Sequence, residues 1–264
     1  MRFDYLKVPI FVICRDKVSP IIQLIDWLEL HGYQRIVFVD NSSTYPPLLE
    51  YFNRTHHEVV RLAENRGPQE SIWSTGVRDQ YAFGGFFVVT DSDVIPDGAC
   101  PGDAIDYFHW ALRRFPSFVK VGFGLRIDDL PSHNELAESI QRWENKFWTR
   151  PFSSNLYEAD IDTTFALYRP HSPFALRPAI RTGIPYVARH QPWYTDSANP
   201  TEEERYYRDH CDPRIAHWDL KGVPIPGKKR ARAILKARIQ WRTRALFRLP
   251  QDRTIPRRYR PKID

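Results

Sequence analysis

Cysteine is scarce in this sequence: Cys14, Cys100 and Cys211 lie far apart among 264 residues, and no C-x-x-C pair occurs. This spacing argues against a disulfide framework and against a zinc–thiolate site, and it favours a reducing compartment. No apolar run is long enough to cross a bilayer. The first residues lead almost directly into an apolar strand, without the pattern of a signal peptide. These features predict a cytoplasmic protein.

Several catalytic motifs are also missing. The chain contains no P-loop, no G-x-S-x-G elbow, no H-E-x-x-H and no G-x-G-x-x-G after its first predicted strand. These absences argue against the enzyme classes that depend on those motifs. Aromatic residues, by contrast, make up 14% of the chain and include eight tryptophans. Such rings either fill a core or stack on the apolar face of a sugar, and both interpretations stay open for each tryptophan.

Positive charge is concentrated at one end of the chain. Residues 227–264 contain 14 of the 38 Lys and Arg residues and two of the 32 Asp and Glu residues, which leaves 24 basic against 30 acidic side chains in 1–226. The net charge of +6 therefore combines a body of about −6 with a tail of about +12. We divide the chain accordingly into a folded domain (1–226) and a basic tail (227–264).

Within the tail, residues 228–249 have the pattern of a basic amphipathic helix, in which nine Lys and Arg residues are interspersed with apolar ones. Anionic lipid headgroups would attract such a helix by about 1 kcal/mol per basic residue near the surface. This would place the protein peripherally on the inner face of the membrane. A helix packed on the acidic body is the main alternative. Nucleic acid is the least favoured partner, because no recognised binding module accompanies the tail.

The N-terminal part of the chain alternates between apolar strands and helices. Strands are predicted at 8–13, 35–39, 58–62 and 85–90, with helices between them that begin at 19, near 47 and at 67. Ser19 is the expected N-cap of the first helix, with Pro20 in its first turn. Such alternation with short connections predicts an α/β fold whose mixed, mostly parallel sheet is flanked by helices.

Beyond residue 96 the pattern changes. The sequence predicts a helix at 103–115, a half-buried strand at 119–125, a helix around 136–147 and a strand at 163–168. The proline-rich segment 170–200 is predicted to be rich in loops. Thr201 and Glu204 form a capping-box pattern, which predicts a short helix after residue 201.

The strand predicted at 85–90 is followed by two aspartates one residue apart, Asp91 and Asp93. It would place both carboxylates at the rim of the sheet, where an oxygen-seeking cation such as Mg²⁺ or Mn²⁺ can carry a diphosphate. The alternative is a solvated turn, because a D-x-D triplet occurs by chance about once in such a chain and Asp160-Ile161-Asp162 is a second one. The position after a fourth strand favours the metal site and an enzyme that handles a nucleotide-sugar.

The loops after the other predicted strands would meet at the same edge of the sheet. Asp40 could accept hydrogen bonds from a nucleobase or ribose. Gly67 permits a close backbone approach at the start of a helix, whose terminus favours anions. The full set of candidate nucleotide-sugar-binding residues is Cys14, Arg15, Asp40, Asn41, Asn65, Arg66, Gly67, Asp91 and Ser92.

Residues 8–13, 37–42 and 64–67, together with Asp91-Ser92-Asp93, resemble the N-terminal half of GT-A-type glycosyltransferases, most closely glycosyltransferase family 2. The resemblance extends over about 6–96 and becomes loose beyond it. It implies a Rossmann-like GT-A fold with a nucleotide-sugar-binding half (1–96) and an acceptor-binding half (97–226). It also implies a nucleotide-diphosphate-sugar donor, and Mn²⁺ or Mg²⁺ bound by Asp91 and Asp93.

The resemblance further implies a catalytic carboxylate downstream. Asp162 is the first choice for the base that takes the proton of the acceptor hydroxyl, with Asp160, Asp128 and Asp129 as alternatives. A structural capping role for Asp162 is supported equally well.

Enzymes of this type also often use a C-terminal histidine as a further metal ligand. His190 is the candidate here, with a structural hydrogen bond as the alternative role. The neighbouring Trp193 and Tyr194 could form a platform for the acceptor.

Together these observations predict a metal-dependent glycosyltransferase that moves a sugar from a nucleotide-diphosphate donor to a saccharide or lipid-linked acceptor in cell-surface glycan synthesis. Inversion is implied by the family-2 resemblance. Two alternatives remain. One is a sugar-nucleotide nucleotidyltransferase, which is disfavoured because residues 13–17 contain no glycine. The other is a degenerate, non-catalytic GT-A module that binds a membrane or a partner.

Overall fold

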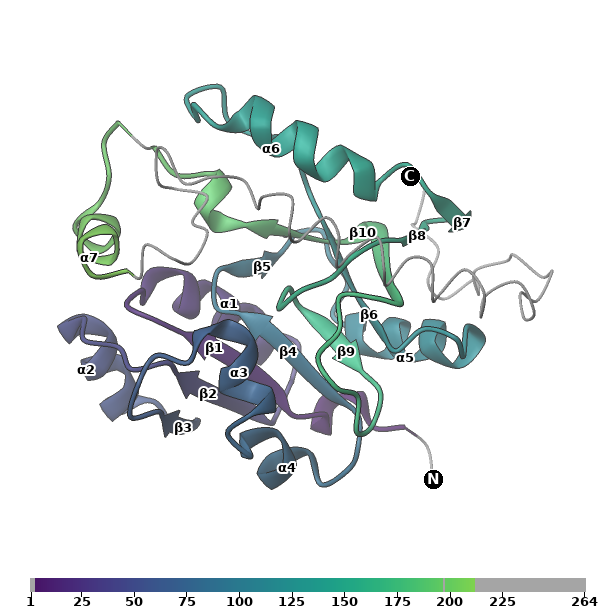
Figure 1. Ribbon diagram of the computed structural model, residues 1–264, viewed down its shortest axis with the longest axis horizontal. Coiled ribbons are helices and arrows are strands. Elements are labelled where there is room, and N and C mark those ends of the chain that lie inside the picture. The colour runs from purple at the N-terminus through teal and green to yellow at the C-terminus, as the bar shows by residue number, and fades with distance from the viewer. Residues whose placement is uncertain (1–2, 197, 212–264) are drawn as a thin grey trace.

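The computed structural model describes residues 3–196 and 198–211, which form one open sheet with helices packed on it (Figure 1). The predicted boundary at 226/227 and the predicted basic helix at 228–249 lie outside the described residues, so both stay predictions. In the part of the chain that is described, no helix combines the length and the apolar character needed to span a membrane.

The secondary structure comprises ten strands, seven α-helices and three short 3₁₀ helices within the described residues. The strands are β1 (Ile10–Cys14), β2 (Ile36–Asp40), β3 (Glu58–Arg61), β4 (Phe87–Asp91), β5 (Val94–Pro96), β6 (Lys120–Leu125), β7 (Pro151–Ser153), β8 (Leu156–Glu158), β9 (Ala166–Tyr168) and β10 (Ala179–His190). The α-helices are α1 (Ser19–Leu30), α2 (Pro46–Arg54), α3 (Gly67–Trp73), α4 (Val77–Ala82), α5 (Ala104–Arg114), α6 (Ala137–Glu144) and α7 (Glu202–His210). The 3₁₀ helices are η1 (Tyr5–Lys7), η2 (Asn145–Phe147) and η3 (Gln191–Trp193).

The first four strands form a parallel unit in the order β3-β2-β1-β4. β9 runs antiparallel between β4 and β6, and β6 pairs in parallel with β10. The hairpin of β7 and β8 extends the sheet beyond β10, and β5 pairs with the end of β10. The predicted mixed, mostly parallel α/β sheet is therefore confirmed.

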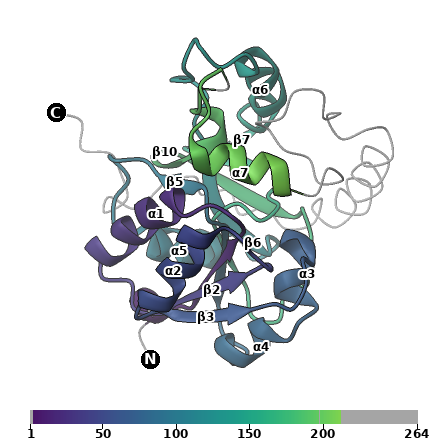
Figure 2. The same cartoon turned by 90° about the vertical axis from the view of Figure 1, so that its left-hand side faces the viewer.

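Two apolar cores lie on opposite faces of this sheet, because alternate residues of β1 enter different cores: Val12 belongs to one and Phe11 to the other. Helices α1, α2 and α5 cover the first face, and α3 and α4 cover the second. Figure 2 shows these two layers on either side of the strands. β1 and β2 are buried at every position, as parallel strands between two helical layers must be.

The segment 170–200 differs from its prediction. The sequence predicts loops there, but the structure contains β10, a strand of 12 residues. Pro185 within it lies where the register of β10 against β6 shifts, between Thr182 and Val187. Such an irregularity tolerates a residue that has no N–H to donate, so a proline is compatible with this strand.

The burial of β6 also differs from its prediction. All six residues of β6 are buried, whereas the alternating pattern predicts a half-buried strand. The reason is its place in the sheet, between β9 and β10, with α5 packed against it. The helix predicted from 67 toward 81 is divided into α3 and α4 near Gly76, which has a left-handed backbone with φ of 79°.

The N-terminus of α1 is capped by another helix. Ser19 is the predicted N-cap, but Val18 occupies that position and makes no side-chain cap bond. Instead, Oε1 of Glu203 in α7 accepts hydrogen bonds from the main-chain N–H groups of Val18 and Ser19, the latter at 3.0 Å. The predicted capping box of Thr201 and Glu204 is confirmed at the start of α7. Glu203 therefore holds α7 against the start of α1.

Glu203→Ala is expected to lower the free energy of unfolding by about 1–2 kcal/mol, because two helix-terminal N–H groups lose their acceptor and a favourable charge. Chemical denaturation measures the difference. Glu202→Ala is the matched control, since Glu202 lies in the same turn of α7 but is exposed. Equal losses in the two variants would contradict the capping role.

Candidate functional site

The loops that follow β1, β2 and β4 meet at one edge of the sheet and are joined by main-chain hydrogen bonds. The N–H of Asn41 donates to the carbonyl of Cys14 at 2.9 Å, and the N–H of Ser92 donates to the carbonyl of Ile13 at 3.1 Å. The candidate residues that follow these strands therefore lie together, as parallel strands require.

β4 and β10 bring Asp91, Asp93 and His190 to this edge. The hydroxyl of Thr163 donates to Oδ2 of Asp91 at 2.6 Å, which fixes that carboxylate. His190 is the last residue of β10 and pairs in register with Val94 of β5. Its Nε2 consequently lies 3.5 Å from Oδ1 of Asp93.

Several negatively charged side chains lie close together at this edge, and their charges affect the pKa values of their neighbours. Burial, together with the charges of Asp93 and Asp162, raises the pKa of Asp91. Burial is the largest influence on Asp93 and opposes its ionisation, but the nearby His190 and Lys17 and a main-chain hydrogen bond together outweigh burial and lower the pKa of Asp93. Burial tends to lower the pKa of His190, and the nearby carboxylates raise it by more. An additional positive charge would therefore be stabilised at this position.

Asp91, Asp93 and His190 fit a divalent cation. Nδ1 of His190 is buried and makes no hydrogen bond with any described residue, and the buried Oδ1 of Asp93 has only the long contact of 3.5 Å to Nε2 of His190. Buried polar atoms without a close partner are uncommon in folded proteins, so these two atoms point to a ligand. Carboxylate oxygens are suitable ligands for both Mg²⁺ and Mn²⁺. Imidazole is compatible with Mn²⁺, which is a transition-metal ion. The geometry favours the predicted metal site, and metal binding itself stays a prediction.

Asp162 lies beside this group, immediately before Thr163. The hydroxyl of Thr164 donates to Oδ1 of Asp162 at 2.8 Å. Although the surrounding protein tends to raise the pKa of Asp162, this hydrogen bond and the positive charges of Arg181 and Lys120 lower it. Asp162 is also exposed to solvent. It is therefore ionised at neutral pH, which is the state that a general base requires.

The alternative carboxylates each pair with an arginine. Asp160 pairs with Arg177. Asp128 and Asp129 both pair with Arg126, at 3.0 and 3.5 Å. Because their charges are offset in this way, Asp162 stays the first choice for the base.

Three of the nucleotide-site candidates, Arg15, Asn41 and Arg66, connect neighbouring loops. Nη1 of Arg15 donates to the carbonyl of Asn41 at 2.7 Å, and Oδ1 of Asn41 accepts from the N–H of Arg66 at 2.8 Å. The thiol of Cys14 is buried and donates to the carbonyl of Val12. A ligand would therefore meet Cys14 through its main chain and not through sulfur.

Asp40 and Asn65 stabilise turns at the same edge. Asp40 is buried, its Oδ1 accepts from the N–H of Ser43 at 2.9 Å, and its Oδ2 lies 3.3 Å from Nε of Arg61. Oδ1 of Asn65 accepts from the N–H of Gly67, which has φ of 72°. Glycine adopts this left-handed backbone without strain. The carboxylate oxygens of Asp40 already contact Ser43 and Arg61, so a nucleotide bound by Asp40 would have to share these oxygens with them.

Trp193 and Tyr194 differ in their access to a ligand. The ring of Trp193 is 2% exposed and packs edge-on against His190, with ring centroids 4.9 Å apart. The hydroxyl of Tyr194 donates to Oδ1 of Asp129 at 2.6 Å. Trp193 therefore supports His190 from the core, and an acceptor platform would depend on Tyr194.

Two buried basic side chains that support the segment 160–163 are not identified from the sequence. Nζ of Lys120 donates to the carbonyl of Ile161 at 2.6 Å. Nε of Arg181 donates to the carbonyl of Asp160 at 2.9 Å, and its Nη1 pairs with Glu144 at 2.7 Å. The position of Lys120 within the apolar stretch 118–123 could have indicated that this lysine is buried. The alternating pattern of a half-buried strand instead predicts that Lys120 faces solvent.

Lys120→Met is expected to change the pH dependence of stability. Burial lowers the pKa of Lys120 from 10.5 to about 7. Between these values the unfolded chain binds more protons than the folded one, so the contribution of Lys120 to the free energy of unfolding rises with pH. The variant should lose this slope, about 1 kcal/mol per pH unit between about pH 7.5 and 9.5.

Urea denaturation of both proteins across this range measures the effect. In each protein the free energy of unfolding is plotted against pH. Subtracting one slope from the other cancels the contribution of thiols and phenols, because these groups titrate in both proteins. Identical slopes would mean that Lys120 keeps its proton in the folded state.

No protein-family model matches this sequence, and no curated protein matches it. Part of the chain is similar to solved structures of glucosyl-3-phosphoglycerate synthase from Mycobacterium tuberculosis. The crystal structure of that enzyme with phosphoglyceric acid matches at 14% identity and a TM-score of 0.38, covering 61% of this chain and 56% of that chain. The complex with Mn²⁺, uridine-diphosphate-glucose and glycerol 3-phosphate matches at 15% identity and a TM-score of 0.35, covering 61% and 57%. The similarity thus spans just over half the length of the synthase.

Proposed function

We propose that this protein is a metal-dependent glycosyltransferase of the GT-A type, most like family 2. It would transfer a sugar from a nucleotide-diphosphate donor to a saccharide or lipid-linked acceptor. The observation that carries the proposal is the convergence of Asp91, Asp93 and His190 at the carboxyl edge of a parallel sheet, with Asp162 beside them. Open α/β sheets bind their ligands beyond this edge.

In the proposed site, Asp91, Asp93 and His190 hold a divalent cation, Mn²⁺ or Mg²⁺. When bound, such an ion offsets the negative charge that develops on the leaving diphosphate. Thr163 keeps Oδ2 of Asp91 in place through its hydrogen bond. Arg15 adds a positive charge at the same edge, where phosphate groups would lie.

Asp162 is the proposed general base. In its ionised state it can accept the proton of the acceptor hydroxyl while that oxygen attacks the anomeric carbon. Attack from the face opposite to the leaving diphosphate inverts the anomeric configuration. Lys120 and Arg181 hold the carbonyls of the segment before Asp162, so they are positioning residues for this step.

A donor-hydrolysis screen tests the proposal. UDP-, GDP-, dTDP- and CMP-sugars are incubated with the protein in the presence of Mn²⁺, of Mg²⁺ or of excess chelator, and nucleotide release is measured. The expected result is release from one class of donor that depends on the metal. Release that is equally fast in excess chelator would refute the metal role, and a lack of release from every donor would refute the transferase.

Calorimetry separates the enzyme from a non-catalytic module of the same fold. If the edge binds a nucleotide through a metal, one nucleoside diphosphate should bind in the presence of Mn²⁺ and bind much more weakly without it. A protein that binds no nucleoside diphosphate but still binds vesicles or a partner would favour the non-catalytic alternative.

A further inference from the structure

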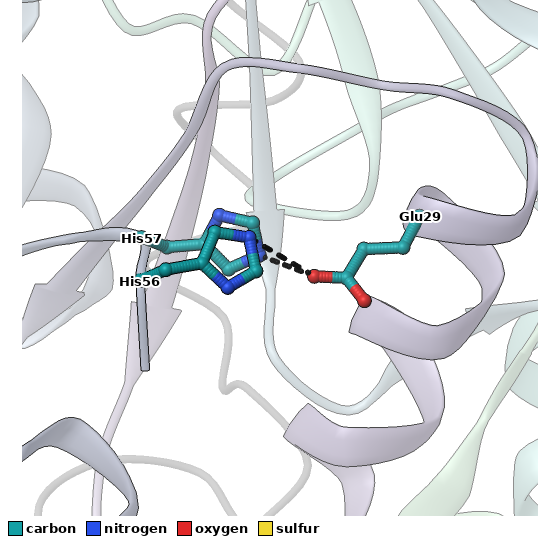
Figure 3. Close-up of side chains that lie close together, drawn as sticks. All are labelled: Glu29, His56 and His57. Carbon is teal, nitrogen blue, oxygen red and sulfur yellow. Dashed lines mark hydrogen bonds and ion pairs between the residues drawn. The ribbon is translucent and has the colours of Figure 1, made fainter. Parts of the chain in front are cut away.

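A second group of metal-ligating side chains lies at the opposite end of the parallel strands. Glu29 belongs to the last turn of α1, and His56 and His57 directly precede β3. The three side chains point toward one another from these two elements (Figure 3). Because they lie at the amino end of β3, they are separate from the carboxylates that follow the carboxyl end of β4.

The distances within this group match the spacing of ligands around a metal ion. Nε2 of His57 lies 2.9 Å and Nε2 of His56 lies 3.5 Å from the same oxygen, Oε1 of Glu29. One ligand atom from each of the three residues lies within 4.8 Å of the other two. Ligands of a tetrahedral zinc ion, with bonds of about 2.0–2.1 Å, are about 3.3 Å apart. Small side-chain rotations would therefore suffice to coordinate an ion.

The surroundings of this group favour a cation with free coordination positions. The group lies at the C-terminal end of α1, which is the negative end of the helix dipole. The group lines an open pocket of about 610 Å³, which water can enter. Arg35 lines the same pocket, but its guanidinium donates to the carbonyls of Lys7 and Tyr81. Glu58 at the pocket wall adds a further negative charge.

We propose that Glu29, His56 and His57 bind a divalent transition-metal ion, of which Zn²⁺ is the best fit. Two imidazoles and one carboxylate are a known donor set for zinc, and water would fill the open position. Imidazole ligands favour Zn²⁺, Cu²⁺ and Ni²⁺ over Mg²⁺. The bound ion would connect the end of α1 to the start of β3, which is the edge strand of the parallel unit.

Calorimetric titration of the chelator-treated full chain with ZnCl₂ tests this site. Zinc binding at the site should weaken by roughly 100-fold or more in His56→Ala and in Glu29→Gln, because the first removes a ligand and the second replaces an anionic ligand with a weakly coordinating amide. The side chain of His56 is 78% exposed, so its removal leaves the core intact. Circular dichroism and thermal melting of both variants verify the fold.

Matched controls separate coordination from general electrostatics. Glu58→Gln removes a carboxylate from the same pocket, and His31→Gln removes an imidazole near the end of α1, without removing a proposed ligand. Both controls should bind zinc as the wild type does. Asp93→Ala should retain the zinc binding that His56→Ala removes, which distinguishes this site from the one at the carboxyl edge.

A second readout is the visible absorption of Co²⁺ added in place of zinc. The spectrum of a nitrogen- and oxygen-ligated ion of low coordination number should appear in the wild type and be lost in His56→Ala. The proposal is overturned if His56→Ala binds zinc with unchanged affinity and stoichiometry, or if Glu58→Gln weakens binding as much as Glu29→Gln does. Glycosyl transfer is not a readout here, so either proposal can fail without affecting the other.

Discussion

Asp93→Ala is expected to lower kcat/KM for sugar transfer by about 10³-fold, or roughly 4 kcal/mol of transition-state stabilisation. Oδ1 of Asp93 is buried, makes no hydrogen bond with the described residues and lies 3.5 Å from Nε2 of His190. The substitution therefore removes a proposed metal ligand and, apart from the long contact to His190, little structural support. Nucleotide release from the preferred donor at saturating Mn²⁺ measures the loss, and circular dichroism shows whether the fold is retained.

Asp79→Ala is the matched control for this prediction. Asp79 is an exposed aspartate on α4 that pairs with Arg78. Its loss should leave both transfer and Mn²⁺ affinity unchanged, whereas Asp93→Ala should also weaken Mn²⁺ binding. A folded Asp93→Ala protein with wild-type activity would contradict the metal role of this carboxylate.

Asp162→Asn is expected to lower kcat by about 10²–10⁴-fold while Mn²⁺ and nucleotide affinity change little. The amide preserves the size of the side chain and can still accept the hydrogen bond from Thr164, but it cannot take a proton from the acceptor. The two substitutions should therefore have different signatures. Asp93→Ala weakens metal binding and rate together, and Asp162→Asn lowers the rate alone.

Asp160→Asn and Asp129→Asn are the comparison variants for Asp162→Asn. Both carboxylates pair with arginines, so their amides should affect the rate much less. If one of them abolishes transfer and Asp162→Asn does not, the base has been assigned to the wrong residue. Single-turnover kinetics with a saturating acceptor makes the comparison independent of product release.

The parallel unit and the edge that carries the candidate site could be predicted from the sequence, because local patterns determine them. β1 and β2 are continuous apolar runs, and each is followed at once by polar residues such as Arg15 and Asn41. Parallel strands then bring those residues to one edge without further information. The same reasoning places Asp91 and Asp93 there.

The remaining features depend on contacts between distant segments. Glu203 caps α1 from 185 positions away along the chain, which no local pattern reveals. Lys120 is buried because β9 and β10 flank β6, and Pro185 obscures the strand pattern of β10. His190 lies beside Asp93 only because β10 pairs with β5. These placements come from the tertiary structure and not from the sequence pattern.

The most direct measurement is a crystal structure of the protein with Mn²⁺ and a nucleoside diphosphate, with the metal located by its anomalous scattering. The expected result is a manganese peak bound by Asp91 and Asp93, with the diphosphate on its other side and His190 within reach. A manganese ion and nucleotide bound elsewhere, with these carboxylates not in contact with either, would contradict the proposed site and the function based on it.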